Sequence, residues 1–157
     1  MFNVHALGGR EMMRRAADEV RAVCSRENIV KPLVIGVTVV TSATGATLRE
    51  VGISDDLETE VVRLARLAAD CGLDGVVASP HEVESVKLAV TKQDFIVVTP
   101  GIRANFATGD DQKRVTTFRR ALANGSDFVV MGRPIVHAPN RSEAVKQIIG
   151  ESDTADK

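Results

Sequence analysis

Val98-Thr99-Pro100-Gly101-Ile102-Arg103 ends one apolar run of the chain, and Val130-Met131-Gly132-Arg133-Pro134 ends the next. Each run has the composition of a buried strand, and each stops at a glycine with an arginine close behind it. In parallel α/β proteins, ligands bind where the strands end. Two consecutive strands that end in glycine and arginine therefore predict a site that holds a phosphate group.

Short apolar runs alternate with helical patterns along the whole chain. Five runs are nearly continuous in apolar residues and predict strands: Phe2–Ala6, Leu33–Val40, Gly75–Ser79, Phe95–Thr99 and Phe128–Met131. Between them, apolar residues recur at steps of three and four, as in Met13–Cys24 and Leu57–Ala68, and predict amphipathic helices. The alternation predicts a parallel sheet covered on both faces. Periodicity alone does not distinguish an open sheet from a closed barrel.

Helix boundaries have their own signals. Ser79-Pro80-His81-Glu82 has the spacing of a capping box with proline at the first helical position, and Asn140-Arg141-Ser142-Glu143 has a similar spacing. Cys71-Gly72 and Asn124-Gly125 predict helix C-caps.

Composition limits the kind of protein. The 157 residues predict one domain over residues 1–150 and a flexible tail over 151–157. A net charge of −1, with no Trp or Tyr, argues against a nucleic-acid partner, and no run is long enough for a membrane helix.

Cys24 and Cys71 predict reduced, buried thiols, and no signal peptide is evident, so we expect a cytoplasmic protein. Gly8-Gly9-Arg10 is too short for a dinucleotide fingerprint, and no histidine spacing predicts a metal site.

Six stretches together resemble orotidine 5′-phosphate decarboxylases of the bacterial type. They occur in the order and at the spacing of that family: Val4-His5-Ala6 before Gly8-Gly9, Val37 to Ser42, Cys71 to Val77, Val98 to Arg103, Gly109-Asp110-Asp111-Gln112-Lys113-Arg114, and Met131 to Pro134. The resemblance runs from Met1 to about Gly150. It implies a homodimeric (β/α)8 TIM barrel that converts orotidine 5′-phosphate to UMP and CO2 without a metal or organic cofactor.

The resemblance starts at the fourth strand of that barrel. It implies an incomplete (β/α)8 barrel with five of eight βα units, strands four to eight. The family's first three units carry a ribose-binding aspartate, a lysine, and a D-x-K-x-x-D motif whose lysine protonates the pyrimidine carbon. Asp111-Gln112-Lys113 matches D-x-K, but Thr116 stands at the final aspartate position. We therefore expect no catalytic residue in this chain and little or no activity from it alone.

The resemblance also implies five substrate-binding residues. Thr41 matches a pyrimidine-contacting hydroxyl, Arg103 and Arg133 match ligand-contacting arginines, and Gln112 matches a phosphate-loop glutamine. A guanidinium suits phosphate because its donors form a planar fork, and Gly132 would let a backbone N–H approach the anion. The structural alternatives are a solvated turn for Thr41 and Gln112, surface ion pairs for the arginines, and a tight turn at Gly132.

Three functions from different classes stay open. The chain is a segment of the decarboxylase, a non-catalytic phosphate-binding fragment that a separate N-terminal segment completes, or a sibling sugar-phosphate barrel such as hexulose-phosphate synthase. Because five units cannot close a barrel, the strands at Phe2–Ala6 and Phe128–Met131 are expected to be open apolar edges. These edges predict association, as a homodimer or by edge-mediated self-association.

Overall fold

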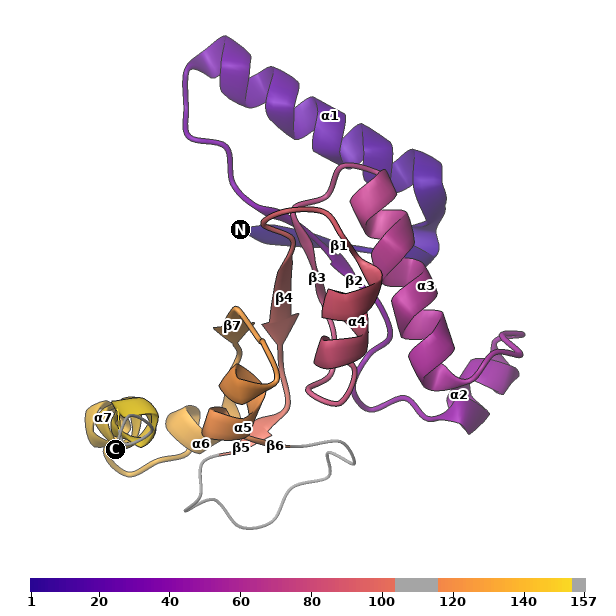
Figure 1. Ribbon diagram of the computed structural model, residues 1–157. Coiled ribbons are helices and arrows are strands. Elements are labelled where there is room, and N and C mark those ends of the chain that lie inside the picture. Colours follow the sequence, from indigo (N-terminus) through magenta and orange to yellow (C-terminus); the bar gives the residue numbers. More distant parts are fainter. Residues whose placement is uncertain (104–115, 154–157) are drawn as a thin grey trace.

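The computed structural model describes residues 1–103 and 116–153 (Figure 1). Its elements, in chain order, are β1 (Phe2–His5), a 3-10 turn η1 (Ala6–Gly8), α1 (Gly9–Glu27), β2 (Val34–Val37), α2 (Gly45–Glu50), α3 (Leu57–Asp70), β3 (Gly75–Val77), α4 (Val83–Ala89), β4 (Ile96–Thr99), β5 (Ile102–Arg103), β6 (Thr116–Thr117), α5 (Phe118–Ala123), β7 (Phe128–Val129), α6 (Arg133–Val136) and α7 (Arg141–Asp153).

The five predicted strands pair into one parallel sheet in the order β1-β2-β3-β4-β7. The prediction of a parallel α/β fold is therefore confirmed, although each strand is shorter than its apolar run. β5 and β6 form a second, two-stranded parallel sheet that the sequence does not predict. Helices connect the parallel strands, because such strands need a crossover rather than a hairpin.

One face of the sheet packs against α1, α3 and α4 (Figure 1). The register places Val4, Gly36, Val76 and Val97 in one row across this face. The predicted apolar stripes of the helices cover the row, and Met13, Ala17, Val61, Leu64 and Ala68 are buried in the same core. A Cβ on Gly36 would lie 3.2 Å from the Cβ of Ala68, so the glycine lets α3 pack close to β2.

The opposite face carries a second row at one register level. It runs through His5, Val37, Val77, Val98 and Phe128, one residue from each strand. Val37 and Val98 are buried, whereas Phe128 at the end of the row is 47% exposed. Among the described strands, β1 and β7 have one neighbour each, which confirms the two edges that the sequence predicts.

Three of the four helix-boundary predictions are confirmed. The Asn140 side chain accepts a hydrogen bond from the Glu143 backbone N–H at 3.1 Å and caps α7. Gly72 and Gly125 have φ values of +82° and +94°, in the left-handed region where glycine ends helices.

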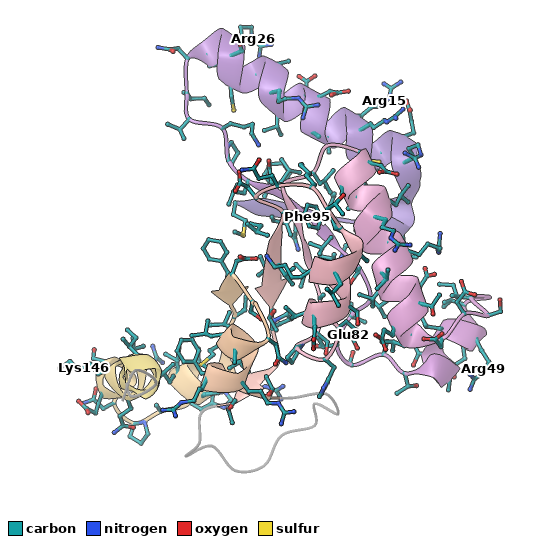
Figure 2. The ribbon with its side chains drawn as sticks, viewed as in Figure 1. Arg15, Arg26, Arg49, Glu82, Phe95 and Lys146 are labelled. Atoms are coloured by element: carbon teal, nitrogen blue, oxygen red, sulfur yellow. The ribbon has the colours of Figure 1, made fainter. Side chains whose placement is uncertain are left out.

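The capping box at Ser79 is wrong. α4 begins at Val83, and Ser79 accepts only from the His81 backbone N–H, at 3.4 Å, in a turn that precedes the helix. Glu82, labelled in Figure 2, is the N-cap residue of α4 and is 4% exposed. The Glu82 backbone N–H donates to the Ser79 carbonyl oxygen at 3.0 Å, so these residues close a turn and the helix begins after it, with Glu82 instead of Ser79 at the N-cap. At the other end of the chain, α7 includes residues 151–153, which the sequence assigns to the tail.

Candidate functional site

The two glycine-arginine segments lie side by side. β4 and β7 are neighbouring parallel strands, so their carboxyl ends meet at the same edge of the sheet. Beyond the strands, the backbone N–H of Val130 donates to the carbonyl oxygen of Thr99 at 2.9 Å. The segments that follow these two residues, Gly101–Arg103 and Gly132–Arg133, therefore leave the sheet from adjacent positions. We call them together the candidate phosphate site.

Gly101 turns the chain at the end of β4. Its φ of +77° is a conformation that a residue with a side chain rarely adopts, and the residue is buried. The turn leads into β5, where the backbone of Arg103 pairs with Thr117. The side chain of Arg103 and the whole of Gln112 lie outside the described residues, so their predicted contacts stay predictions.

Gly132 and Arg133 are both exposed at the start of α6. Gly132 has a φ of −106°, and among the described residues no atom lies within 4 Å of a Cβ built there. Neither a left-handed backbone nor crowding in the described protein requires glycine at this position. The exposed backbone leaves room for a ligand atom, as the prediction for Gly132 requires.

Thr41 lies in the turn between β2 and α2 and is half-buried. The Ala43 backbone N–H donates to the Val40 carbonyl oxygen at 2.9 Å and closes this turn. β2 lies two strands from β4, and Thr41 follows β2 at the same carboxyl edge of the sheet. The structure thus brings Gly101, Gly132 and Arg133 to adjacent strand ends and places Thr41 at the same edge.

The sequence prediction missed the burial of five polar side chains near the ends of strands and helices: Thr38, Ser79, Glu82, Thr99 and Ser126. The Thr38 hydroxyl donates to the Val77 carbonyl oxygen at 2.8 Å, and the hydroxyls of Thr99 and Ser126 lie 2.7 Å apart. The only signal in the sequence was their position at the ends of apolar runs, which is equally typical of solvated turns.

Four described groups have shifted pKa values, and none of them is a predicted site residue; one is Arg63, whose pKa is raised by its hydrogen bond to the Glu60 carboxylate. Burial would raise the pKa of Asp74, but hydrogen bonds from Lys31 and from the Val34 backbone N–H outweigh burial and lower it. Burial raises the pKa of the Cys71 thiol. Hydrogen bonds from Thr59 lower the pKa of Asp56 at the start of α3. The carboxylates of Asp74 and Asp56 accept from backbone N–H groups at the start of β2 and of α3.

A cavity of about 790 Å³ runs along α3 and is lined by charged residues of α1 and α3, among them Arg10, Glu58 and Asp70. Of the predicted substrate-binding residues whose side chains or backbone the structure describes in full, none of Thr41, Gly132 and Arg133 lines it. Within residues 1–103 and 116–153, no three His, Cys, Asp or Glu side chains are grouped so that they could hold a metal ion. None of the described helices combines the length and apolar character needed to cross a membrane.

Comparison with known proteins gives a consistent result. Residues 1–148 match the family model described as "Orotidine 5'-phosphate decarboxylase / HUMPS family". Curated proteins named orotidine 5'-phosphate decarboxylase from Syntrophotalea carbinolica and Trichlorobacter lovleyi are 50% and 47% identical over 99% and 96% of this chain. A crystal structure of orotidine 5'-phosphate decarboxylase from Lactobacillus acidophilus superposes with a TM-score of 0.79 at 34% identity, over 96% of this chain.

The match covers only part of each relative. The chain spans 63% and 61% of the two curated proteins and 62% of the crystallised one. Over its own length, however, the match is nearly complete and includes both segments of the candidate phosphate site. The chain therefore belongs to the orotidine 5′-phosphate decarboxylase / HUMPS family.

Proposed function

We propose that this chain is the phosphate- and pyrimidine-binding part of an orotidine 5′-phosphate decarboxylase, the enzyme that converts orotidine 5′-phosphate to UMP and CO2 in pyrimidine biosynthesis. The adjacency of Gly101–Arg103 and Gly132–Arg133 carries the proposal, because it brings two segments of the right chemistry to one edge of a parallel sheet. The names of the curated relatives support the choice of substrate.

We infer that the five strands are strands four to eight of a (β/α)8 barrel. The row through His5, Val37, Val77, Val98 and Phe128 supports this inference, since strands of such a barrel contribute side chains to interior layers at matching levels. The exposure of Phe128 fits a layer that further strands would complete.

Each site residue then has a distinct role. Arg103 and Arg133 donate hydrogen bonds to the phosphate, and Gly132 admits the phosphate to its backbone N–H. Gln112 adds an amide donor, and the Thr41 hydroxyl contacts the pyrimidine, which it can do as donor or acceptor. Phosphate contacts lie far from the reacting carbon, and their binding energy is used in the transition state. In this family the reaction requires neither metal nor organic cofactor.

The chain alone is proposed to bind but not to catalyse. The family's D-x-K-x-x-D motif, which holds the proton-donating lysine, has no match in the 157 residues. Assay of CO2 release from orotidine 5′-phosphate by the purified chain is expected to give no turnover. Turnover that disappears in Arg133→Ala would contradict this part of the proposal.

Calorimetric titration with UMP tests the binding function. We expect saturable binding that is at least about tenfold weaker in Arg133→Ala, because a charged phosphate contact is lost. Arg15→Ala is the matched control, since Arg15 is exposed on α1 and pairs with Glu11 at 2.7 Å. Absence of UMP binding by a folded wild-type chain would overturn the proposal.

A second candidate function is a non-catalytic fragment that a separate N-terminal segment completes, and the open edges at β1 and β7 favour it over a self-sufficient domain. Mixing the chain with the remaining N-terminal part of the Syntrophotalea carbinolica relative is expected to restore turnover. A mixture that forms a stable complex but stays inactive would count against complementation.

A sibling sugar-phosphate enzyme, such as hexulose-phosphate synthase, is the third candidate. The matching family model spans both the decarboxylase and HUMPS, whereas the curated relatives reported above are named as the decarboxylase. Titration with a hexulose phosphate beside UMP separates the decarboxylase from the sugar-phosphate enzyme, and tighter binding of the sugar phosphate would favour the sugar-phosphate enzyme.

Homodimer formation is proposed on the family resemblance alone, and a cytoplasmic location on the composition alone.

A further inference from the structure

The turn between α5 and β7, residues Asn124 to Ser126, is anchored on both sides. Asn124 donates from its side-chain nitrogen to the Pro80 carbonyl oxygen at 3.2 Å, in the turn after β3. The Ser126 hydroxyl lies 2.7 Å from the Thr99 hydroxyl at the end of β4. Ser126 is 7% exposed and Thr99 is fully buried, so the hydroxyl pair is shielded from water. A hydrogen bond in such surroundings is stronger than one in water, and its loss is costly.

Thr99 makes a second link to the same unit through its backbone. Its carbonyl oxygen accepts from the Val130 N–H at 2.9 Å. Thr99 stands two residues before Gly101, and Val130 stands two residues before Gly132. Through its backbone and side chain together, one buried threonine therefore connects the two segments of the candidate phosphate site.

We propose that Thr99 and Ser126 are positioning residues that set the spacing between Gly101–Arg103 and Gly132–Arg133. This inference rests on the proposed function, since it concerns the same phosphate. Neither hydroxyl needs to touch the ligand. Small displacements of groups that bind one phosphate weaken binding strongly, so the site depends on the residues that hold its two halves in place.

Thr38 offers a matched control. It is 1% exposed, it also follows a strand, and its hydroxyl donates one hydrogen bond, to the Val77 carbonyl oxygen at 2.8 Å. This bond joins β2 to β3 and does not involve either segment of the candidate phosphate site. A Thr→Val change at position 38 or 99 therefore removes a similar buried hydrogen bond, but only the change at 99 is predicted to disturb phosphate binding.

The first experiment compares UMP with uridine, which lacks the phosphate, for wild type, Thr99→Val, Thr99→Ser, Ser126→Ala and Thr38→Val. We expect Thr99→Val and Ser126→Ala to weaken UMP binding about tenfold while uridine binding changes less than twofold. Thr99→Ser should return UMP binding to within twofold of wild type, because it keeps the hydroxyl. Equal effects of Thr99→Val and Thr38→Val, or equal losses for UMP and uridine, would overturn the proposal.

The second experiment needs no ligand and measures backbone amide exchange by NMR. In Thr99→Val or Ser126→Ala, we expect faster exchange at Val130 and at Ile135 and Val136, whose N–H groups donate to Gly132. The Thr38 amide, which donates to Val77, should keep its wild-type rate. Unchanged exchange at Val130 in both variants would contradict the positioning role. If the wild-type chain binds no UMP, the proposed function fails, and the exchange result alone then decides for or against the positioning role.

Discussion

Two aspartates make the same set of contacts in different parts of the sheet. Asp74 directly precedes β3 and Asp127 directly precedes β7. One carboxylate oxygen of each accepts hydrogen bonds from a lysine and from a backbone N–H of the neighbouring strand: Lys31 and Val34 for Asp74, Lys87 and Val97 for Asp127. Each aspartate thus joins its own strand to the preceding one at the amino edge of the sheet, opposite the candidate phosphate site.

Replacing either aspartate by asparagine should lower stability. We expect Asp74→Asn and Asp127→Asn each to reduce the free energy of unfolding by about 1 kcal/mol, because charged hydrogen bonds are lost but the lysines are partly solvated. Urea denaturation measures the change. Asp94→Asn is the control, since Asp94 is exposed at a φ of +58° that asparagine tolerates. A loss as large in Asp94→Asn as in the other two variants would refute the role of these contacts.

The lowered pKa of Asp74 also predicts a pH dependence. Because the pKa is lower in the folded state than the unfolded value of 3.8, Asp74 stabilises the fold fully above that value. The stabilisation is lost as the pH falls through the folded pKa. Urea denaturation between pH 6 and pH 2.5 should therefore show a steeper loss of stability below about pH 4 in wild type than in Asp74→Asn. Parallel curves for the two proteins would show that Asp74 does not contribute.

At the scale of the elements, β3 and β4 approach closely at one glycine. A Cβ on Gly75 would lie 2.3 Å from the carbonyl oxygen of Ile96 and 2.4 Å from its Cγ1. The backbone of β4 cannot yield without breaking its pairing with β3, in which Gly75 stands opposite Ile96. Glycine is therefore required here by contact with the neighbouring strand.

Gly75→Ala is expected to lower the free energy of unfolding by about 2 kcal/mol or more, because the added methyl forces the strands apart. Gly150→Ala serves as the control, since no atom among the described residues lies within 4 Å of a Cβ at that position in α7. There the change should stabilise the protein by up to about 1 kcal/mol. Denaturation midpoints that move in the same direction for both variants would disprove the close-contact explanation.

At the scale of the whole molecule, the sheet ends in two apolar edges. Phe2 on β1 and Phe128 on β7 are 41% and 47% exposed, and Val130 just after β7 is 51% exposed. Unpaired strand edges with exposed apolar side chains favour association with another chain. Either additional strands of a barrel or a second copy of this chain would cover them.

Light scattering of the purified chain is expected to show self-association that increases with concentration. Phe128→Lys should shift the molecules toward monomer, because a charge at the edge opposes strand pairing. Leu88→Lys is the control, since Leu88 is 77% exposed on α4, away from both edges. A monodisperse wild-type monomer at high concentration would contradict this prediction.

The sequence predicts where the candidate site lies, at the ends of β4 and β7, but not what supports it. The left-handed φ of Gly101 was not predicted, and the exposure of Gly132 and Arg133 leaves their role in binding a prediction. The buried Glu82 and the hydroxyl pair of Thr99 and Ser126 were not predicted. Glycine and arginine at a strand end are local signals, whereas burial of a polar side chain depends on what packs over it.

The sequence by itself determined which segments are strands and helices and that the strands are parallel, because periodicity, capping residues and apolar runs act within about a dozen residues. Only the tertiary structure decided which of these segments are neighbours. Asp74 meets Lys31 across 43 residues and Ser126 meets Thr99 across 27, through strand order and register. Such contacts have no sequence spacing of their own, because they arise only when the sheet has formed.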